Sequence, residues 1–153
     1  MVKTIFIALL LVFGILAAQP ARAAGYCAAH PTEDALHALP MALVPAAQAA
    51  FGLHGLSAAQ TRRMTVIRCM GGKVYACFIG ANLPCGKANK ARNLPAASDW
   101  CEDNPNAGFV PAYISGHDSI YAWRCLCGRP VHVGPPAALD QRGFFKRYWK
   151  NLG

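Results

Sequence analysis

The sequence predicts a small α+β domain: a disulfide-stapled antiparallel β-sheet built from two hairpins, with an N-terminal helical segment and a C-terminal amphipathic helix. Three observations lead to this class. Two apolar stretches each surround a two-residue turn, seven cysteines follow an export signal, and the last residues have an amphipathic helical period. Together they favour an exported domain whose small core is reinforced by disulfides.

Residues 1–23 have the form of a cleavable signal peptide. Lys3 supplies the positive charge, residues 5–18 are almost entirely apolar, and residues 21–23 (Ala-Arg-Ala) fit the small-x-small pattern of a cleavage site. The apolar run is shorter than the roughly 20 residues of a membrane-spanning helix, so a retained anchor is the less favoured alternative. We therefore expect a periplasmic or secreted protein in which residues 24–153 form a single disulfide-stabilised domain.

The exported chain is moderately basic. Removal of Lys3 and Arg22 with the signal lowers the formal net charge from +8 to +6. This surplus favours an anionic partner, although solubility alone would account for it. Nucleic acid is not expected as a partner, because the chain is exported and holds no recognisable nucleic-acid module. Membrane contact is expected to be peripheral at most, because no later stretch is apolar enough to cross a bilayer.

Two short helices are expected before the first hairpin and one after it. Pro45 suits the first turn of a helix that runs to Phe51 and ends near Gly52. Residues 57–60 (Ser-Ala-Ala-Gln) form a capping-box pattern that starts a further turn. In the Asn-, Gly- and Pro-rich stretch between the hairpins, Ser98 is expected to start another short helix.

The two hairpins are predicted from a near-repeat in which Arg68-Cys69-Met70-Gly71-Gly72-Lys73 aligns with Arg124-Cys125-Leu126-Cys127-Gly128-Arg129. Apolar residues lead into and out of each turn, as in β-hairpins. Pro130 indicates an edge position in the second hairpin. The expected core comprises Val66, Ile67, Val74, Phe78, Ile79, Ile120, Trp123, Val131, Phe145 and Trp149.

An odd number of cysteines leaves one without a partner in the monomer. Cys127 stands where Gly71 stands in the first turn, so it is the predicted free thiol, with Cys27 as the second candidate. Six cysteines allow fifteen connectivities, and a Cys85–Cys101 bond that closes a basic loop is one expectation. The predicted disulfide framework comprises Cys27, Cys69, Cys77, Cys85, Cys101 and Cys125.

The C-terminus is predicted to be an amphipathic helix from about Asp140. Four apolar residues fall on one helical face and three cations on the other: Phe145, Tyr148, Trp149 and Leu152, against Arg142, Lys146 and Lys150. We expect the aromatic face to dock on the sheet. The alternative is a basic aromatic helix that touches anionic lipid or polymer.

Several stretches resemble a family of small exported proteins of Gram-negative bacteria. They are residues 74–77, residues 80–88, Trp100-Cys101 with Asn104-Pro105, and residues 116–125. The resemblance covers about Val66 to Trp149. Because the family is uncharacterised, the resemblance implies export and a shared fold but no activity. Cys127 departs from the family pattern, which has glycine there.

We expect a non-enzymatic binding or structural module of the cell envelope, with an anionic envelope component or a protein as its partner. The anion-binding candidates are Lys87, Lys90 and Arg92, because cations beside asparagines and backbone donors can hold an anion. The alternative is a solvated loop. No catalytic residue, metal ligand or cofactor is assigned.

A thiol- or metal-dependent activity centred on Cys127, His117 and Asp118 is the alternative function. A thiolate near an imidazole could act as a nucleophile, and Cys125, Cys127 and His132 could supply three ligands to zinc or copper. Nothing in the sequence shows that these residues meet. In exported proteins, cysteines more often pair with one another.

Overall fold

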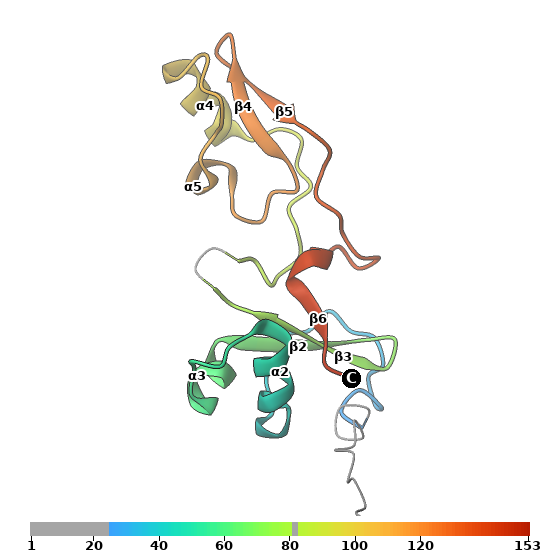
Figure 1. The fold of residues 1–153 in the computed structure, drawn as a ribbon. Coiled ribbons are helices and arrows are strands. Elements are labelled where there is room, and N and C mark those ends of the chain that lie inside the picture. The colour runs from blue at the N-terminus through green and yellow to red at the C-terminus, as the bar shows by residue number, and fades with distance from the viewer. Residues whose placement is uncertain (1–24, 81–82) are drawn as a thin grey trace, which may run out of the picture.

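The computed structural model describes residues 25–80 and 83–153, which form two small units (Figure 1). The predicted signal peptide, residues 1–23, lies outside the described residues. The first unit holds a four-stranded antiparallel sheet in the order β1-β2-β3-β6, and the second holds the two-stranded sheet β4-β5. The predicted α+β class is confirmed. The prediction of one sheet built from both hairpins is wrong, because β1 and β6 occupy the two edges of the β2–β3 hairpin.

The first unit contains β1 (His37–Ala38), a 3-10 turn η1 (Met41–Leu43), α2 (Val44–Phe51), α3 (Ala58–Arg63), β2 (Thr65–Met70), β3 (Lys73–Phe78), a 3-10 turn η2 (Lys146–Tyr148) and β6 (Trp149–Asn151). The second unit contains α4 (Pro95–Asp103), α5 (Ala112–Ser115), β4 (Ala122–Leu126) and β5 (Arg129–Val133). Two connecting segments, residues 83–94 and 134–145, run between the units (Figure 1). Among the described residues, no helix is long and apolar enough to span a membrane.

Both predicted hairpins are confirmed, and their turns have the same backbone geometry. Gly71 and Gly72 have φ values of 60° and 74°, and Cys127 and Gly128 have values of 49° and 75°. Positive φ at both central residues defines the two-residue turn that matches strand twist. The sequence alignment of Cys127 with Gly71 therefore corresponds to a real structural equivalence.

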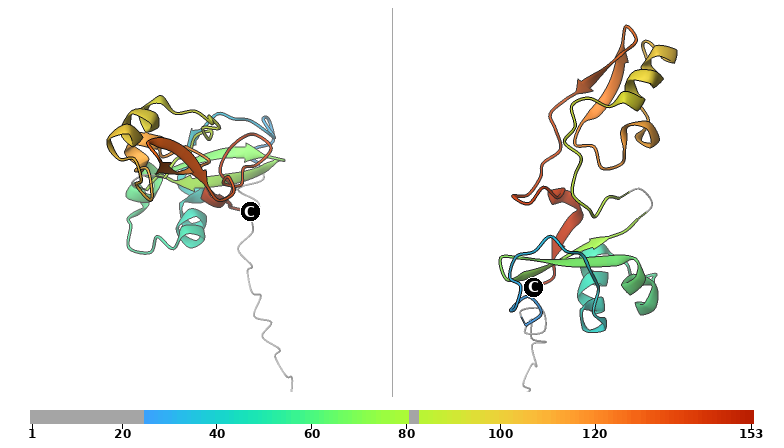
Figure 2. Two further views of the ribbon diagram at one scale, coloured as in Figure 1. Left: turned by 90° about the horizontal axis from the view of Figure 1, so that it is seen from above. Right: turned by 180° about the vertical axis from the view of Figure 1, so that it is seen from behind.

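The β2–β3 sheet is covered on both faces (Figure 2). Ile67, Cys69 and Val74 pack on one face against α2 and the N-terminal segment. On the opposite face, Cys77 packs against Phe144 of the returning C-terminal segment. Alternation of side chains along each strand produces these two faces. Pairing at both edges and cover on both faces make β2–β3 the centre of the first unit.

The predicted C-terminal helix is wrong. The Asp140 carboxylate accepts hydrogen bonds from the backbone N–H groups of Arg142 and Phe144, at 2.8 and 3.0 Å, which fixes a turn in place of a helix start. Gly143 has a φ of 91°, outside the helical region. Trp149 then pairs with Cys77 as part of β6. The apolar spacing fits a helix locally, but pairing with the free edge of β3 determines the outcome.

Two of the three predicted helices have the expected starts. Pro45 lies in the first turn of α2, and Gly52 caps its end with a φ of 68°. Ser57 forms the predicted capping box with Gln60 at the start of α3. The third helix, α4, starts at Pro95 and not at Ser98. Proline suits the first helical position because a backbone N–H there would have no hydrogen-bond partner within the helix, so nothing is lost by its absence.

Three disulfides join Cys27 to Cys69, Cys77 to Cys85, and Cys101 to Cys125, and Cys127 is free and exposed. The expected Cys85–Cys101 bond is wrong, because Cys85 lies against β3 and Cys101 against β4. Three such bonds indicate an oxidising compartment.

Most of the predicted core is buried or half-buried. The buried residues are Ile67, Val74, Trp123, Phe145 and Trp149, and the half-buried ones are Val66, Phe78, Ile120 and Val131. Ile79 is 42% exposed because β3 ends before it.

Candidate anion-binding site

The predicted basic loop lies along the 134–145 segment between the two units. The N–H of Ala88 donates to the carbonyl oxygen of Gly143 at 2.8 Å, and the N–H of Asn89 donates to the carbonyl oxygen of Asp118 at 2.7 Å. These hydrogen bonds hold the loop to the other connecting segment and to the second unit. The chain around Lys87, Lys90 and Arg92 is therefore fixed by its backbone.

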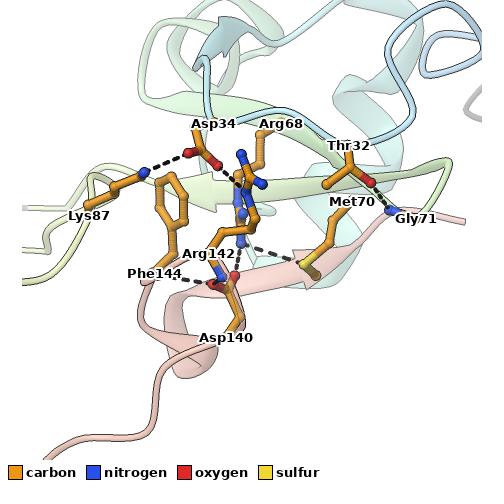
Figure 3. Close-up of polar contacts among 9 residues, drawn as sticks. All are labelled: Thr32, Asp34, Arg68, Met70, Gly71, Lys87, Asp140, Arg142 and Phe144. Carbon is orange, nitrogen blue, oxygen red and sulfur yellow. Dashed lines mark hydrogen bonds and ion pairs between the residues drawn. The ribbon is translucent and has the colours of Figure 1, made fainter.

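The three predicted anion-binding cations have different neighbours. Lys87 pairs with Asp34 at 2.5 Å, and Arg142 pairs with the same carboxylate at 2.6 Å (Figure 3). These contacts lower the pKa of Asp34 to about 2, and the hydrogen bond from Arg142 is the largest cause. Lys90 lies against Gly143, whereas the Arg92 guanidinium lies 5.8 Å from the Tyr121 ring centroid. Lys87 thus serves an ion-pair network, and Lys90 and Arg92 make no ion pair within the described part of the chain.

Tyr121 belongs to an aromatic cluster at the open end of the β4–β5 hairpin. Its ring stacks on His132 with 4.0 Å between centroids, and Trp123 meets His132 edge-on at 4.2 Å. Ser119 orders the cluster, since its hydroxyl accepts hydrogen bonds from the Trp123 indole N–H and the Tyr121 backbone N–H. The sequence analysis named His132 only as a possible metal ligand and did not single out Tyr121. The alternation along residues 120–123 is the only sequence signal for them.

A pocket of about 270 Å³ opens beside this cluster. Arg147 reaches it from the C-terminal segment, and its guanidinium lies 4.6 Å from the Tyr148 ring centroid. No carboxylate lies within 4 Å of Arg92 or Arg147 in the described residues. The pocket is lined by Ser119, Ile120, Tyr121, Ala122, Pro135, Ala137 and Arg147. Uncompensated cations beside a stacked aromatic surface suit a ligand that is both flat and anionic.

Two larger hollows offer less to an anion. One, of about 560 Å³, is lined by Asp140, Arg142 and Lys146, but Arg142 is already paired with Asp34. The other, of about 510 Å³, is lined by Arg62 and Arg63 together with exposed Met41. Arg62 is held by a hydrogen bond from its Nε to the Leu39 carbonyl oxygen at 3.1 Å. The Arg63 hollow is the competing position for an anionic ligand.

A buried arginine, which the sequence analysis missed, fixes the segment that carries Arg147. Arg68 is fully buried and pairs with Asp140, and Phe144 lies beside it (Figure 3). The Arg68 guanidinium lies 3.9 Å from the Phe144 ring centroid and 4.6 Å from that of Trp149. Burial raises the pKa of Asp140, but hydrogen bonds from Phe144 and Arg68 outweigh it, so the pKa is lowered overall. The sequence signal for this buried arginine is its position as a single charged residue within an otherwise apolar strand.

The alternative site is not assembled. Cys127 lies in the hairpin turn, whereas His117 and Asp118 precede the opposite end of β4. Five strand residues, at about 3.3 Å each, separate the two ends. Cys125, a proposed metal ligand, is in a disulfide. In residues 25–80 and 83–153, no group of three His, Cys, Asp or Glu side chains is placed to hold a metal ion.

Comparisons with protein-family models, curated proteins and solved structures find no match to this chain. The function is therefore inferred from the residues of the pocket and their charges. The feature that most restricts the ligand is the combination of Arg92, Tyr121 and Arg147. These three come from separate segments of the chain and meet only in the fold.

Proposed function

We propose that the protein is an exported, non-enzymatic binding module of the bacterial cell envelope, and that its ligand is an acidic polysaccharide. The carrying observation is the pocket of about 270 Å³ that Tyr121 and Arg147 both line, with the Arg92 guanidinium 5.8 Å from the Tyr121 ring centroid. Within the described residues, neither arginine has a carboxylate partner. Sugar rings present flat apolar faces to aromatic side chains, and guanidinium groups bind carboxylates in a bidentate manner. The three disulfides support an exported location.

The backbone around the pocket suits a binding module. Ile120, beside Tyr121, is hydrogen-bonded to both connecting segments. Its N–H donates to the Asn89 carbonyl oxygen at 3.0 Å, and its carbonyl oxygen accepts from the N–H of Ala137 at 2.8 Å. The site therefore changes little when a ligand arrives, which limits the entropy lost on binding. The formal charge of +6 outside the predicted signal would also speed the approach of an anionic polymer.

Isothermal titration calorimetry with oligogalacturonate tests this function. Arg92→Gln and Arg147→Gln should each weaken binding by about tenfold, as expected for the loss of one charge-assisted contact of about 1.4 kcal/mol. A neutral maltooligosaccharide of equal length should not bind, because it lacks the carboxylates.

Arg63→Gln is the matched control, since Arg63 is an exposed arginine at the competing hollow. If Arg63→Gln weakens binding and the two pocket variants do not, the ligand site lies at that hollow and the proposal is wrong. Equal binding of neutral and acidic sugars would also contradict it.

A further inference from the structure

The two hairpins correspond residue by residue. Because both turns have two residues, the cross-strand pairs occupy the same register: Arg68 pairs with Tyr75 as Arg124 pairs with Val131, and Met70 with Lys73 as Leu126 with Arg129. Directly paired residues share a face of the sheet. The face that carries Arg68 in the first hairpin therefore corresponds to the face that carries Arg124 in the second.

That face is covered in one hairpin and open in the other. Arg68 is 0% exposed beneath the C-terminal segment, with Asp140 against its charge and Phe144 over its guanidinium. Arg124 is exposed, as are Leu126 at 48% and Val133 at 43%. We call the outer side of β4–β5 the open face; its residues are Ala122, Arg124, Leu126, Arg129, Val131 and Val133.

The described chain does not supply a cover for the open face. α4 packs on the opposite side of the hairpin, where Cys101 is bonded to Cys125 and Trp123 is buried. No carboxylate in the described residues lies within 4 Å of Arg124 or Arg129. Two arginines and exposed aliphatic side chains thus remain together on one side of a sheet, a combination typical of protein interfaces.

We infer that the open face docks a segment of a partner protein that carries an acidic residue and aromatic side chains. The chain's own cover of the first hairpin shows the chemistry that this surface accepts. There, a carboxylate pairs with the arginine, and aromatic rings pack over its guanidinium and the neighbouring apolar residues. At the open face, a partner carboxylate would pair with Arg124, and its aromatic groups would cover Leu126 and Val133.

The test uses the exported chain labelled with ¹⁵N and a peptide of residues 138–149 in which Arg142, Lys146 and Arg147 are each changed to Glu. Amide shifts should cluster in residues 122–133, and a control peptide with Gln at those three positions and Asn in place of Asp140 should give none. Arg124→Glu should weaken binding by about tenfold or more, since it replaces attraction with repulsion. Lys73→Glu, at the register position of Arg129 but in the covered hairpin, should leave binding unchanged.

Three outcomes of this titration would overturn the inference. They are the absence of shifts at millimolar peptide, shifts centred on the first hairpin, and equal weakening by the Lys73 variant. Sedimentation velocity of the protein alone should show a monomer. A concentration-dependent dimer that Arg124→Glu abolishes would identify a second copy as the occupant and reject a separate partner. Arg124 is exposed and unpaired in the described structure, so its variant should fold normally.

Discussion

Around their turns, the β2–β3 and β4–β5 hairpins place an arginine, a cysteine, an apolar residue and a cation at the same register positions, but their surroundings differ. β2–β3 is flanked by β1 and β6, has cover on both faces, and encloses Arg68. β4–β5 stands alone, with α4 on one face and the equivalent Arg124 exposed on the other. The local sequence pattern therefore determines that a hairpin forms, whereas the segments packed against the hairpin determine whether an equivalent residue is buried or exposed.

The largest difference between the hairpins should appear when the equivalent arginines are removed. Arg68→Ala should lower the free energy of unfolding by about 3–5 kcal/mol, because it breaks a buried ion pair and opens a cavity. Arg124→Ala should change it by about 0.5 kcal/mol or less, as exposed residues do. Urea denaturation of the disulfide-bonded protein measures both. Similar costs for the two variants would contradict the proposed difference in cover.

Removal of a disulfide should next show that the second hairpin depends more on its cross-link. The double variant Cys101→Ala/Cys125→Ala should lower the free energy of unfolding by about 2–5 kcal/mol and expose the amides of residues 122–133 to hydrogen exchange, since no other strand in the described structure pairs with them. The matched control, Cys27→Ala/Cys69→Ala, should leave β2–β3 amides protected by β1 and β6. Simultaneous loss of protection in both units would show that they unfold as one.

The turns allow a third comparison, with a smaller effect of about 1 kcal/mol. Cys127→Gly should stabilise the protein, because Cys127 has a φ of 49° that glycine adopts at less cost. Gly71→Ala should destabilise it by a similar amount; a Cβ there meets no atom within 4 Å, so the cost is conformational only. Denaturation without reductant measures both variants. A neutral or destabilising Cys127→Gly would mean that the thiol side chain has a structural role.

The hairpins could be predicted from sequence because their information is local. A two-residue Gly-Gly or Cys-Gly turn between apolar runs fixes the register, and Ser57 with Gln60 fixes a helix start over a single turn. The assignment of Cys127 to a turn position followed from the same local pattern. In each case, the interacting residues are neighbours in the sequence.

The C-terminal segment and the site could not be predicted because their contacts are distant in the sequence. Asp140 pairs with Arg68, and Trp149 pairs with Cys77 across a strand edge that the sequence does not reveal. The helical spacing of the aromatic residues competed with this pairing, and burial against the sheet prevailed. Likewise, Arg92 and Arg147 gather around Tyr121 only after the two connecting segments are in place.

The smallest expected effect concerns the ion pairs that tie the N-terminal segment to the first hairpin's cover. Hydrogen bonds from Arg142 and Lys87 lower the pKa of Asp34 to about 2 from an ordinary value of 3.8. Because the folded pKa is the lower one, the stabilisation is fully present above about pH 4 and is lost as the pH falls through 2. Among the described residues, none forms such a pair with the second hairpin, so its amides should not respond to this titration. Carboxyl NMR should show Asp34 titrating near pH 2, and Arg142→Gln should move that midpoint upward; a midpoint near 3.8 in the unaltered protein would refute the pairing.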